Sequence, residues 1–149
     1  IRVLKLAGVY LLAMGLAAAV SPPAPAQPPA SGWGLEQGQP VEVCKPQGQR
    51  AWLAQLQCAD GSELSWRRAG SVGTRSPLPA DMPMDLMEKY ISGAALAPGE
   101  PDYHMIDSYQ VDCGGNSQLV YLDMYHCDGP AVQRAPAGFV LAASEASAP

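Results

Sequence analysis

Charged residues are scarce in this chain of 149 residues, and the motifs that identify most function classes are missing. Only 15% of the residues are charged, with fourteen acidic and nine basic side chains, which excludes a coiled coil and the basic arm of a nucleic-acid-binding protein. The sequence contains no phosphate-binding loop, no dinucleotide fingerprint and no zinc-finger cysteine spacing. After these exclusions the composition is typical of a small secreted domain, and it does not indicate a particular biochemical activity.

No apolar run is long enough to span a bilayer, although a shorter one lies near the start of the chain. Residues 6–20 carry no charge, follow two basic residues and give way to small residues and prolines. A positive flank, an apolar stretch and a small-residue exit are typical of a secretory signal peptide, whereas a spanning helix needs about 20 apolar residues. We therefore expect a signal peptide at residues 1–26, cleaved before Gln27, with a cut after Ala19 as the alternative.

Removal of this signal peptide would leave seven basic and fourteen acidic residues, a net charge of −7 with both histidines neutral. An acidic domain is repelled by nucleic acid and by anionic lipid surfaces. We therefore expect no nucleic-acid partner and, after signal removal, no membrane span. The abundance of alanine, glycine and proline is typical of GC-rich bacterial coding sequence, which favours a periplasmic or secreted protein.

Proline and alanine mark the two ends of the predicted folded part. Residues 27–40 are proline-rich and predict an extended linker, and residues 128–149 predict a largely disordered Ala/Pro-rich tail. A short apolar run at 138–141 can still dock as a strand. Residues 41–127 then form a single globular domain, which is small enough to gain stability from covalent cross-links.

Hydrophobic patterning predicts an α+β fold for this domain: a small antiparallel sheet of two hairpins, with four to five strands, and one packed helix. The first hairpin begins with alternating apolar residues at 52–58 and turns at Gly61, while residues 41–43 can add a short first strand. The stretch 67–79 shows no periodicity and predicts an exposed loop. An all-β sandwich or barrel is the alternative fold.

The second hairpin has the stronger strand pattern. Residues 103–113 and 118–127 flank a Gly-Gly-Asn turn, and joining their apolar faces sets Val111 opposite Val120. Between the two hairpins, a helix is predicted over residues 81–93, from a capping aspartate to a terminal glycine.

Four cysteines in a small exported domain predict two disulfides. Cys44 and Cys58 have the same spacing as Cys113 and Cys127, which makes nearest-neighbour pairing attractive. In a straight second hairpin, however, Cys127 lies about 30 Å along the strand from the position opposite Cys113, and a disulfide spans at most about 7 Å. The bonds therefore run between the two hairpins, as 44–113 with 58–127 or as 44–127 with 58–113.

Two groups of polar side chains are candidate ligand-binding sites. In the predicted register Asp107 lies diagonal to His126, and a buried acid needs a partner. With His104 and Tyr125 beside it, this pair can transfer protons, bind a ligand or brace the sheet. A second group is cationic and suits an anionic ligand or an acidic partner. Its members, in the predicted loop, are Arg67, Arg68 and Arg75.

No set of side chains forms a recognisable catalytic site. The sequence has no Gly-x-Ser-x-Gly elbow, and the cysteines are expected in disulfides rather than as nucleophiles or as metal ligands with the histidines. We therefore assign no catalytic residue, no metal and no cofactor. The sequence favours a non-catalytic binding protein of inhibitor, immunity or envelope-accessory type, whose partner is a protein or an envelope component. A small periplasmic hydrolase that uses an Asp/His pair is the alternative.

Overall fold

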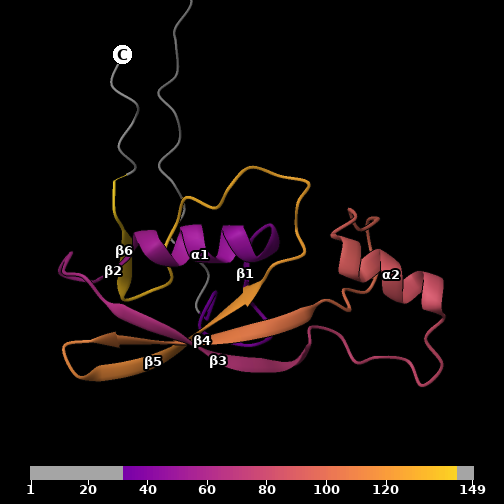
Figure 1. The fold of residues 1–149 in the computed structure, drawn as a ribbon, viewed down its shortest axis with the longest axis horizontal. Helices are drawn as coiled ribbons and strands as arrows, with labels where there is room; N and C mark the ends of the chain where they lie inside the picture. The colour runs from indigo at the N-terminus through magenta and orange to yellow at the C-terminus, as the bar shows by residue number, and fades with distance from the viewer. Residues whose placement is uncertain (1–31, 144–149) are drawn as a thin grey trace, which may run out of the picture.

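The computed structural model describes residues 32–143, and the predicted signal peptide at 1–26 lies outside this part. Two helices and six strands form the described part (Figure 1). In chain order they are β1 (Val41–Glu42), α1 (Lys45–Gln55), β2 (Leu56–Cys58), β3 (Ser65–Thr74), α2 (Met84–Ser92), β4 (Met105–Cys113), β5 (Asn116–Asp123) and β6 (Phe139–Leu141). Neither helix has the length and apolar character that crossing a membrane requires.

Four of the strands form a mixed sheet in the order β1-β5-β4-β3, with β1 parallel to β5 and the other neighbours antiparallel. Strands β2 and β6 form a separate two-stranded antiparallel sheet. Helix α1 lies over the larger sheet, whereas α2 lies to one side, away from α1 (Figure 1). The α+β fold class is confirmed, and β6 confirms the strand predicted near residues 138–141.

The β4–β5 hairpin is present as predicted, but its register differs by two residues. Tyr109 lies opposite Val120, the position that the prediction gives to Val111. Gly114 and Gly115 have φ values of 56° and 89° and close the hairpin as a two-residue turn, shorter than the predicted one. A shift of two residues leaves every side chain on its predicted face, so the apolar sets of the two strands still meet.

The first predicted hairpin is present only around its turn, where Gly61 has a φ of 81° and Gln57 bridges Glu63 in the predicted register. Residues 52–58 form the end of α1 and the short strand β2 rather than one continuous strand. From residue 49 to residue 56 the buried residues are Gln49, Trp52, Leu53 and Leu56, whose spacing of three and four suits a helix. Because the first buried residue of this series, Gln49, is polar, the sequence lacks an apolar residue there to mark the helical spacing. The apolar residues at 52–58 then show the alternation that is typical of a strand.

The exposed loop predicted at 67–79 is also wrong over most of its length, because β3 continues to Thr74. This strand forms the edge of the larger sheet and pairs with β4, with register shifts next to Gly70 and Gly73. Most of its side chains are exposed on both faces of the sheet. No alternation marks it in the sequence, because neither face is buried.

Helix α2 ends at Gly93, as predicted, where φ is 74°. It begins at Met84, and the residue at its N-cap is Pro83, so the predicted cap by Asp81 is wrong. Tyr90 is the buried residue of this helix. The apolar side chains on its outer face are therefore left exposed.

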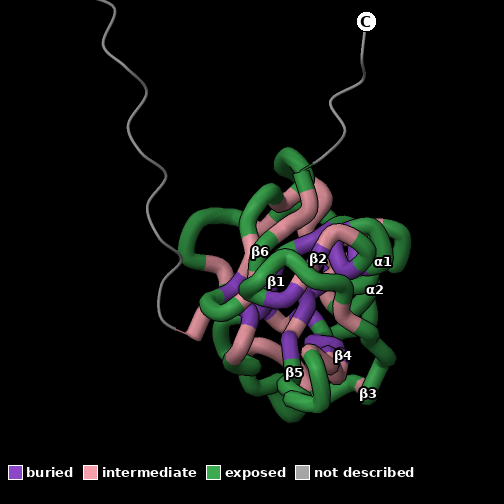
Figure 2. The backbone as a smooth tube through the Cα atoms, turned by 90° about the vertical axis from the view of Figure 1, so that its left-hand side faces the viewer, coloured by how far each residue is buried: buried purple, intermediate pink, exposed green. Residues whose placement is uncertain are grey.

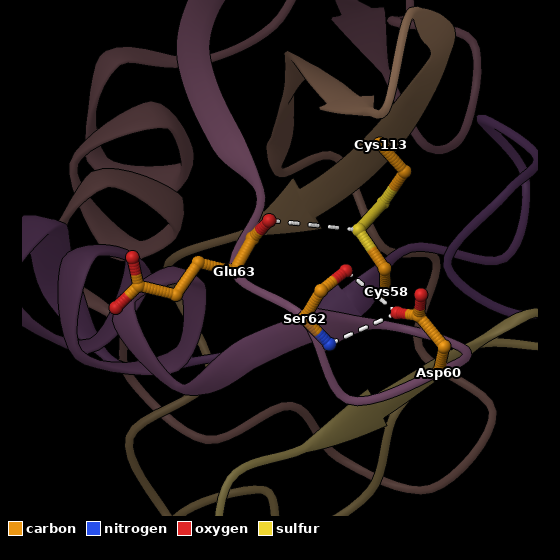
Figure 3. The surroundings of a disulfide bond; sticks show 5 residues. All are labelled: Cys58, Asp60, Ser62, Glu63 and Cys113. Carbon is orange, nitrogen blue, oxygen red and sulfur yellow. Dashed lines mark hydrogen bonds between the residues drawn. A yellow bond between two sulfur atoms is a disulfide. The ribbon is translucent and has the colours of Figure 1, made fainter.

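Two disulfides, Cys44–Cys127 and Cys58–Cys113, link the two halves of the chain, with Cα–Cα distances of 4.6 and 5.8 Å. This is one of the two predicted pairings, and the exclusion of nearest-neighbour pairing is confirmed. Figure 3 shows Cys58 beside the turn that follows β2, bonded to Cys113 at the end of β4. The second disulfide therefore ties that turn to the tip of the β4–β5 hairpin.

The hydrophobic core lies between α1 and the larger sheet. The buried residues, purple in Figure 2, gather in the middle of the molecule. Its buried members are Val41, Val43, Trp52, Leu53, Leu56, Tyr109, Val111, Val120 and Leu122. Residues 32–40 pack against this body, because the Gly34 carbonyl accepts a hydrogen bond from the Tyr121 backbone nitrogen and Pro40 is buried. The described part of the predicted linker is thus packed rather than extended.

Candidate metal centre

Two histidines and two aspartates gather where β4 begins and β5 ends. Asp102 and His104 precede β4, Asp123 is the last residue of β5, and His126 follows it by three residues. Each of these side chains offers one nitrogen or oxygen atom, and the four atoms lie within 4.8 Å of one another. We call these four residues the His/Asp cluster.

Local turns orient the two carboxylates. Asp102 Oδ1 accepts a hydrogen bond from the His104 backbone nitrogen at 2.9 Å, and Asp123 Oδ1 accepts one from the Tyr125 backbone nitrogen at 3.1 Å. An aspartate that binds the backbone two residues ahead is fixed by its own turn. The second oxygens, Asp102 Oδ2 and Asp123 Oδ2, then lie 3.1 and 3.0 Å from His126 Nε2.

Strand pairing and a disulfide hold the segment that carries His126. The Val43 backbone nitrogen donates to the Asp123 carbonyl at 2.8 Å, and the Val43 carbonyl accepts from the His126 backbone nitrogen at 3.1 Å. The next residue, Cys127, is bonded to Cys44. His126 is therefore fixed by the backbone on one side and by a covalent bond on the other.

The distances among three donor atoms of the cluster are close to those between the ligands of a four-coordinate cation. His104 Nδ1 lies 3.3 Å from His126 Nε2 and 3.4 Å from Asp123 Oδ2, and His126 Nε2 lies 3.0 Å from that same oxygen. Asp102 approaches the histidines through two different oxygens, with Oδ1 2.9 Å from His104 Nδ1 and Oδ2 3.1 Å from His126 Nε2, and one atom from each of the four residues fits within 4.8 Å. A tetrahedral ion with bonds of about 2.0–2.1 Å would hold its ligands about 3.3 Å apart.

The fixed charges around the cluster leave two negative charges to be balanced. Asp102, Asp123 and Glu42 each contribute a carboxylate, and Arg75 Nη1 donates to Glu42 Oε1 at 2.7 Å and to Asp102 Oδ2 at 2.9 Å. With both histidines neutral, three carboxylates and one guanidinium give a net charge of −2. One divalent cation or two protons would neutralise it, and buried charge requires such compensation.

The carboxylates make the two imidazoles strong bases. Burial alone would lower the pKa of each ring, but the hydrogen bonds to Asp102 and Asp123 outweigh this effect and raise the pKa of His104 to about 9 and that of His126 to about 10. Burial would raise the pKa of both aspartates, but their contacts with the histidines hold it below the usual value. The cluster therefore attracts positive charge, whether as protons or as a metal ion.

Aromatic packing orients the His104 ring. The ring stacks on Tyr125 with a centroid distance of 5.2 Å and meets Tyr90 edge-on at 5.5 Å. His104 Nε2 is buried and has no hydrogen-bond partner within residues 32–143, so Nδ1 is turned toward the cluster by packing rather than by the usual second hydrogen bond. By contrast, His126 Nδ1 lies 3.7 Å from a carboxylate oxygen of Glu42.

Four protein donors suit metal binding better than turnover. Structural zinc sites have four protein ligands, most often cysteines with histidines, whereas catalytic zinc sites keep one position for water. The candidate ligands here are two imidazole nitrogens and two carboxylates. Imidazole nitrogen favours first-row transition metals, while Mg²⁺ and Ca²⁺ prefer oxygen ligands alone. The His/Asp cluster is therefore suited to hold an ion such as Zn²⁺ in a closed site.

Three of the predicted ligand residues meet here, since His104 and His126 supply donors and Tyr125 stacks on His104. The two aspartates of the cluster are missing from the sequence-based candidates. Their signal is the pair of motifs Asp-x-His at Asp102 and Asp-x-x-His at Asp123, at the start and at the end of two strands that were predicted to pair. Antiparallel pairing brings those two ends together.

The predicted contact between Asp107 and His126 is wrong. In the shorter hairpin Asp107 lies opposite Leu122, on the face of the sheet that packs against α1. Its carboxylate accepts hydrogen bonds from Gln49 Nε2 at 3.1 Å, Arg68 Nη2 at 2.7 Å and Ser71 Oγ at 2.9 Å. Asp107 therefore links α1 to β3 across β4 and lies outside the His/Asp cluster.

Two of the three arginines predicted as a loop patch, Arg67 and Arg68, lie on β3. Arg67 donates to the side chain of Gln110 on β4, and Arg68 forms an ion pair with Asp107 at 2.7 Å. Both guanidinium groups have partners within the protein, and neither reaches the His/Asp cluster. The third arginine of the predicted patch, Arg75, lies just after β3 and forms the ion pairs beside the cluster.

Replacing Asp107 by asparagine should lower the free energy of unfolding by roughly 1–3 kcal/mol at neutral pH, because a buried charged acceptor is lost. Burial would raise the pKa of Asp107, but its three donors outweigh burial and hold it below the ordinary value of 3.8. The folded state therefore binds fewer protons than the unfolded state, and this stabilisation is present above about pH 4 and lost in more acidic solution. Urea unfolding at pH 7 and pH 3 should show a difference from the original protein that shrinks at pH 3. Asp112→Asn, a less buried change on the same strand, is the control.

Comparison with known protein families, curated proteins and solved structures found no match to this chain.

Proposed function

We propose that this chain is an exported, non-catalytic binding protein whose His/Asp cluster holds one divalent transition-metal ion, with Zn²⁺ as the expected species. The observation that carries the proposal is the mutual approach of His104 Nδ1, His126 Nε2 and Asp123 Oδ2 to 3.0–3.4 Å. Donor atoms at this spacing share positive charge, either as protons in hydrogen bonds or as one metal ion, and a metal ion would take the place of the protons.

Export is supported by the two disulfides, because such bonds persist in oxidising compartments. The signal-like sequence at residues 1–26 points to the same route. The proposed location is therefore the periplasm or the extracellular space.

A binding role is preferred over the alternative of a hydrolase because the four donors leave no open coordination position for an attacking water. A closed metal site braces the surface around it, much as a disulfide does. We accordingly propose that the protein acts by binding a partner, which is a protein or an envelope component.

Titration of the purified protein with Zn²⁺ by calorimetry should give one ion per chain. His126→Gln removes a donor at a partly exposed position and should weaken zinc binding by more than the roughly 10–100-fold typical of outer-shell changes. Glu42→Gln leaves all four donors in place, and its zinc affinity should decrease by no more than this roughly 10–100-fold. Asp112→Asn lies outside the cluster and should bind zinc as the original protein does.

Zinc binding without a fixed stoichiometry, or equally tight binding by His126→Gln, would contradict the proposal. Asp102→Asn preserves side-chain volume and gives a second donor variant should His126→Gln fail to fold. Cobalt provides an independent measure, because tetrahedral Co²⁺ absorbs visible light strongly. That absorption should appear with the original protein and disappear in both donor variants.

A further inference from the structure

The outer face of α2 carries an exposed apolar row. Met84, Met87 and Ile91 are 80%, 40% and 65% exposed, and their spacing of three and four places them along one side of the helix. Leu78 and Met105 add exposed apolar side chains next to this row, at 52% and 39%. We call these five residues the α2 surface.

Two surface hollows lie within the α2 surface, and both are lined by Met87 and Ile91. One hollow of about 270 Å³ lies between Met87 and Ile91 on the helix and Leu78 and Met105 beside it. Its lining is mainly apolar and aromatic, and it also includes His104. A second, more open hollow lies along the helix at Met84, Met87 and Ile91. A contiguous apolar surface with hollows is typical of a site that another molecule covers.

Acidic side chains flank this surface. Asp85 and Glu88 line the open hollow together with the methionines, and both are exposed. Neither forms an ion pair with a residue of the described part of the chain. Of the nearby cations, Lys89 is paired with Glu100 and Arg75 with Asp102. The edge of the α2 surface therefore offers uncompensated negative charge.

This charge decides between the kinds of molecule that could cover the surface. An anionic lipid surface is repelled by it. In a symmetric dimer the same patch faces itself, which would bring Asp85 and Glu88 of one copy toward those of the other. An apolar partner that carries positive charge gains both hydrophobic contact and charge complementarity.

We propose that the α2 surface docks a cationic amphipathic helix of a partner protein. Such a helix presents apolar side chains at every third or fourth residue, which enter the hollows, and basic side chains beside them, which meet Asp85 and Glu88. Flexible methionine side chains adapt to the apolar face of such a helix. The five residues of the α2 surface are not metal donors, but His104, one of the four proposed donors, lines part of the first hollow.

A synthetic 18-residue peptide with leucine at helical spacing and lysine at the other positions is the probe. Calorimetry should give one peptide per chain, with affinity that falls as salt concentration rises. The double change Met87→Gln and Ile91→Gln should weaken binding by at least about tenfold, because both hollows lose an apolar wall. The double change Asp85→Asn and Glu88→Gln should weaken it by a smaller factor and reduce the salt dependence. Leu119→Gln changes an equally exposed residue on β5 and is the control.

The same peptide with glutamate in place of lysine should not bind, and its equal binding would overturn the proposal. So would binding that the Met87→Gln, Ile91→Gln protein retains in full. Dimerisation that this variant abolishes would assign the surface to a second copy, and binding to anionic vesicles would assign it to a membrane, each against the proposal. Repeating the titration with zinc and with a chelator separates this result from that of the His/Asp cluster.

Discussion

Removal of the Cys44–Cys127 disulfide by a double alanine change should lower the free energy of unfolding by about 2–5 kcal/mol and should also weaken zinc binding. The bond joins residues 83 positions apart, so it removes a large amount of chain entropy from the unfolded state. It also anchors the residue next to His126, whose ring nitrogen is one of the proposed donors. Urea unfolding and calorimetric zinc titration measure the two effects.

The Cys58–Cys113 bond provides the matched comparison. It spans 55 positions and should contribute a similar amount to stability, but it lies at the tip of the β4–β5 hairpin, at the end opposite the His/Asp cluster. The double alanine change at Cys58 and Cys113 should therefore leave zinc affinity unchanged while the protein is folded. An equal loss of affinity in both double variants would show that the disulfides act on the site only through global stability.

The disulfide pairing illustrates what geometry allows a sequence to predict. A strong hairpin pattern between Cys113 and Cys127 rules out their direct bond, whatever the details of the turn. The same reasoning leaves two pairings, because it does not place Cys44 relative to either end of the hairpin. In the structure the parallel pairing of β1 with β5 selects between these two disulfide patterns. It brings Cys44, which follows β1, beside the residues that follow β5, so that Cys44 bonds to Cys127.

The candidate site was half predictable for a related reason. His104 and His126 are rare residues near the ends of two predicted strands, so composition alone draws attention to them. Asp102 and Asp123 are two of many acidic residues, and only the strand ends that carry them separate them from the rest. Asp107 interrupts an apolar strand face, which indicates burial but does not identify the partner of the carboxylate. The hydrogen-bond donors to Asp107 lie on β3 and α1, and the sequence did not predict the positions of these two elements.

Helix α1 offers the sharpest stability test of the fold, because the sequence also fits a strand there. In the helix Trp52 and Leu53 are both buried, at 3% and 1% exposure. In the alternating strand they would face opposite sides, and Leu53 would lie in solvent. Leu53→Ala should lower the free energy of unfolding by about 2–5 kcal/mol, as a large-to-small change in a packed core does. In a strand the same change would stay within about 0.5 kcal/mol.

Ala54 gives the opposite result and completes the test. It is exposed on the helix, where Ala54→Gln should change the free energy of unfolding by less than about 0.5 kcal/mol. In the strand Ala54 would share the inward face with Trp52, and a glutamine there would place a large polar group in the core at a cost of about 1–3 kcal/mol. Urea unfolding of both variants therefore compares two orderings. A large loss of stability in Leu53→Ala together with little change in Ala54→Gln supports the helix. The reverse result would contradict it, because a half-buried strand that buries Trp52 and Ala54 turns Leu53 toward solvent.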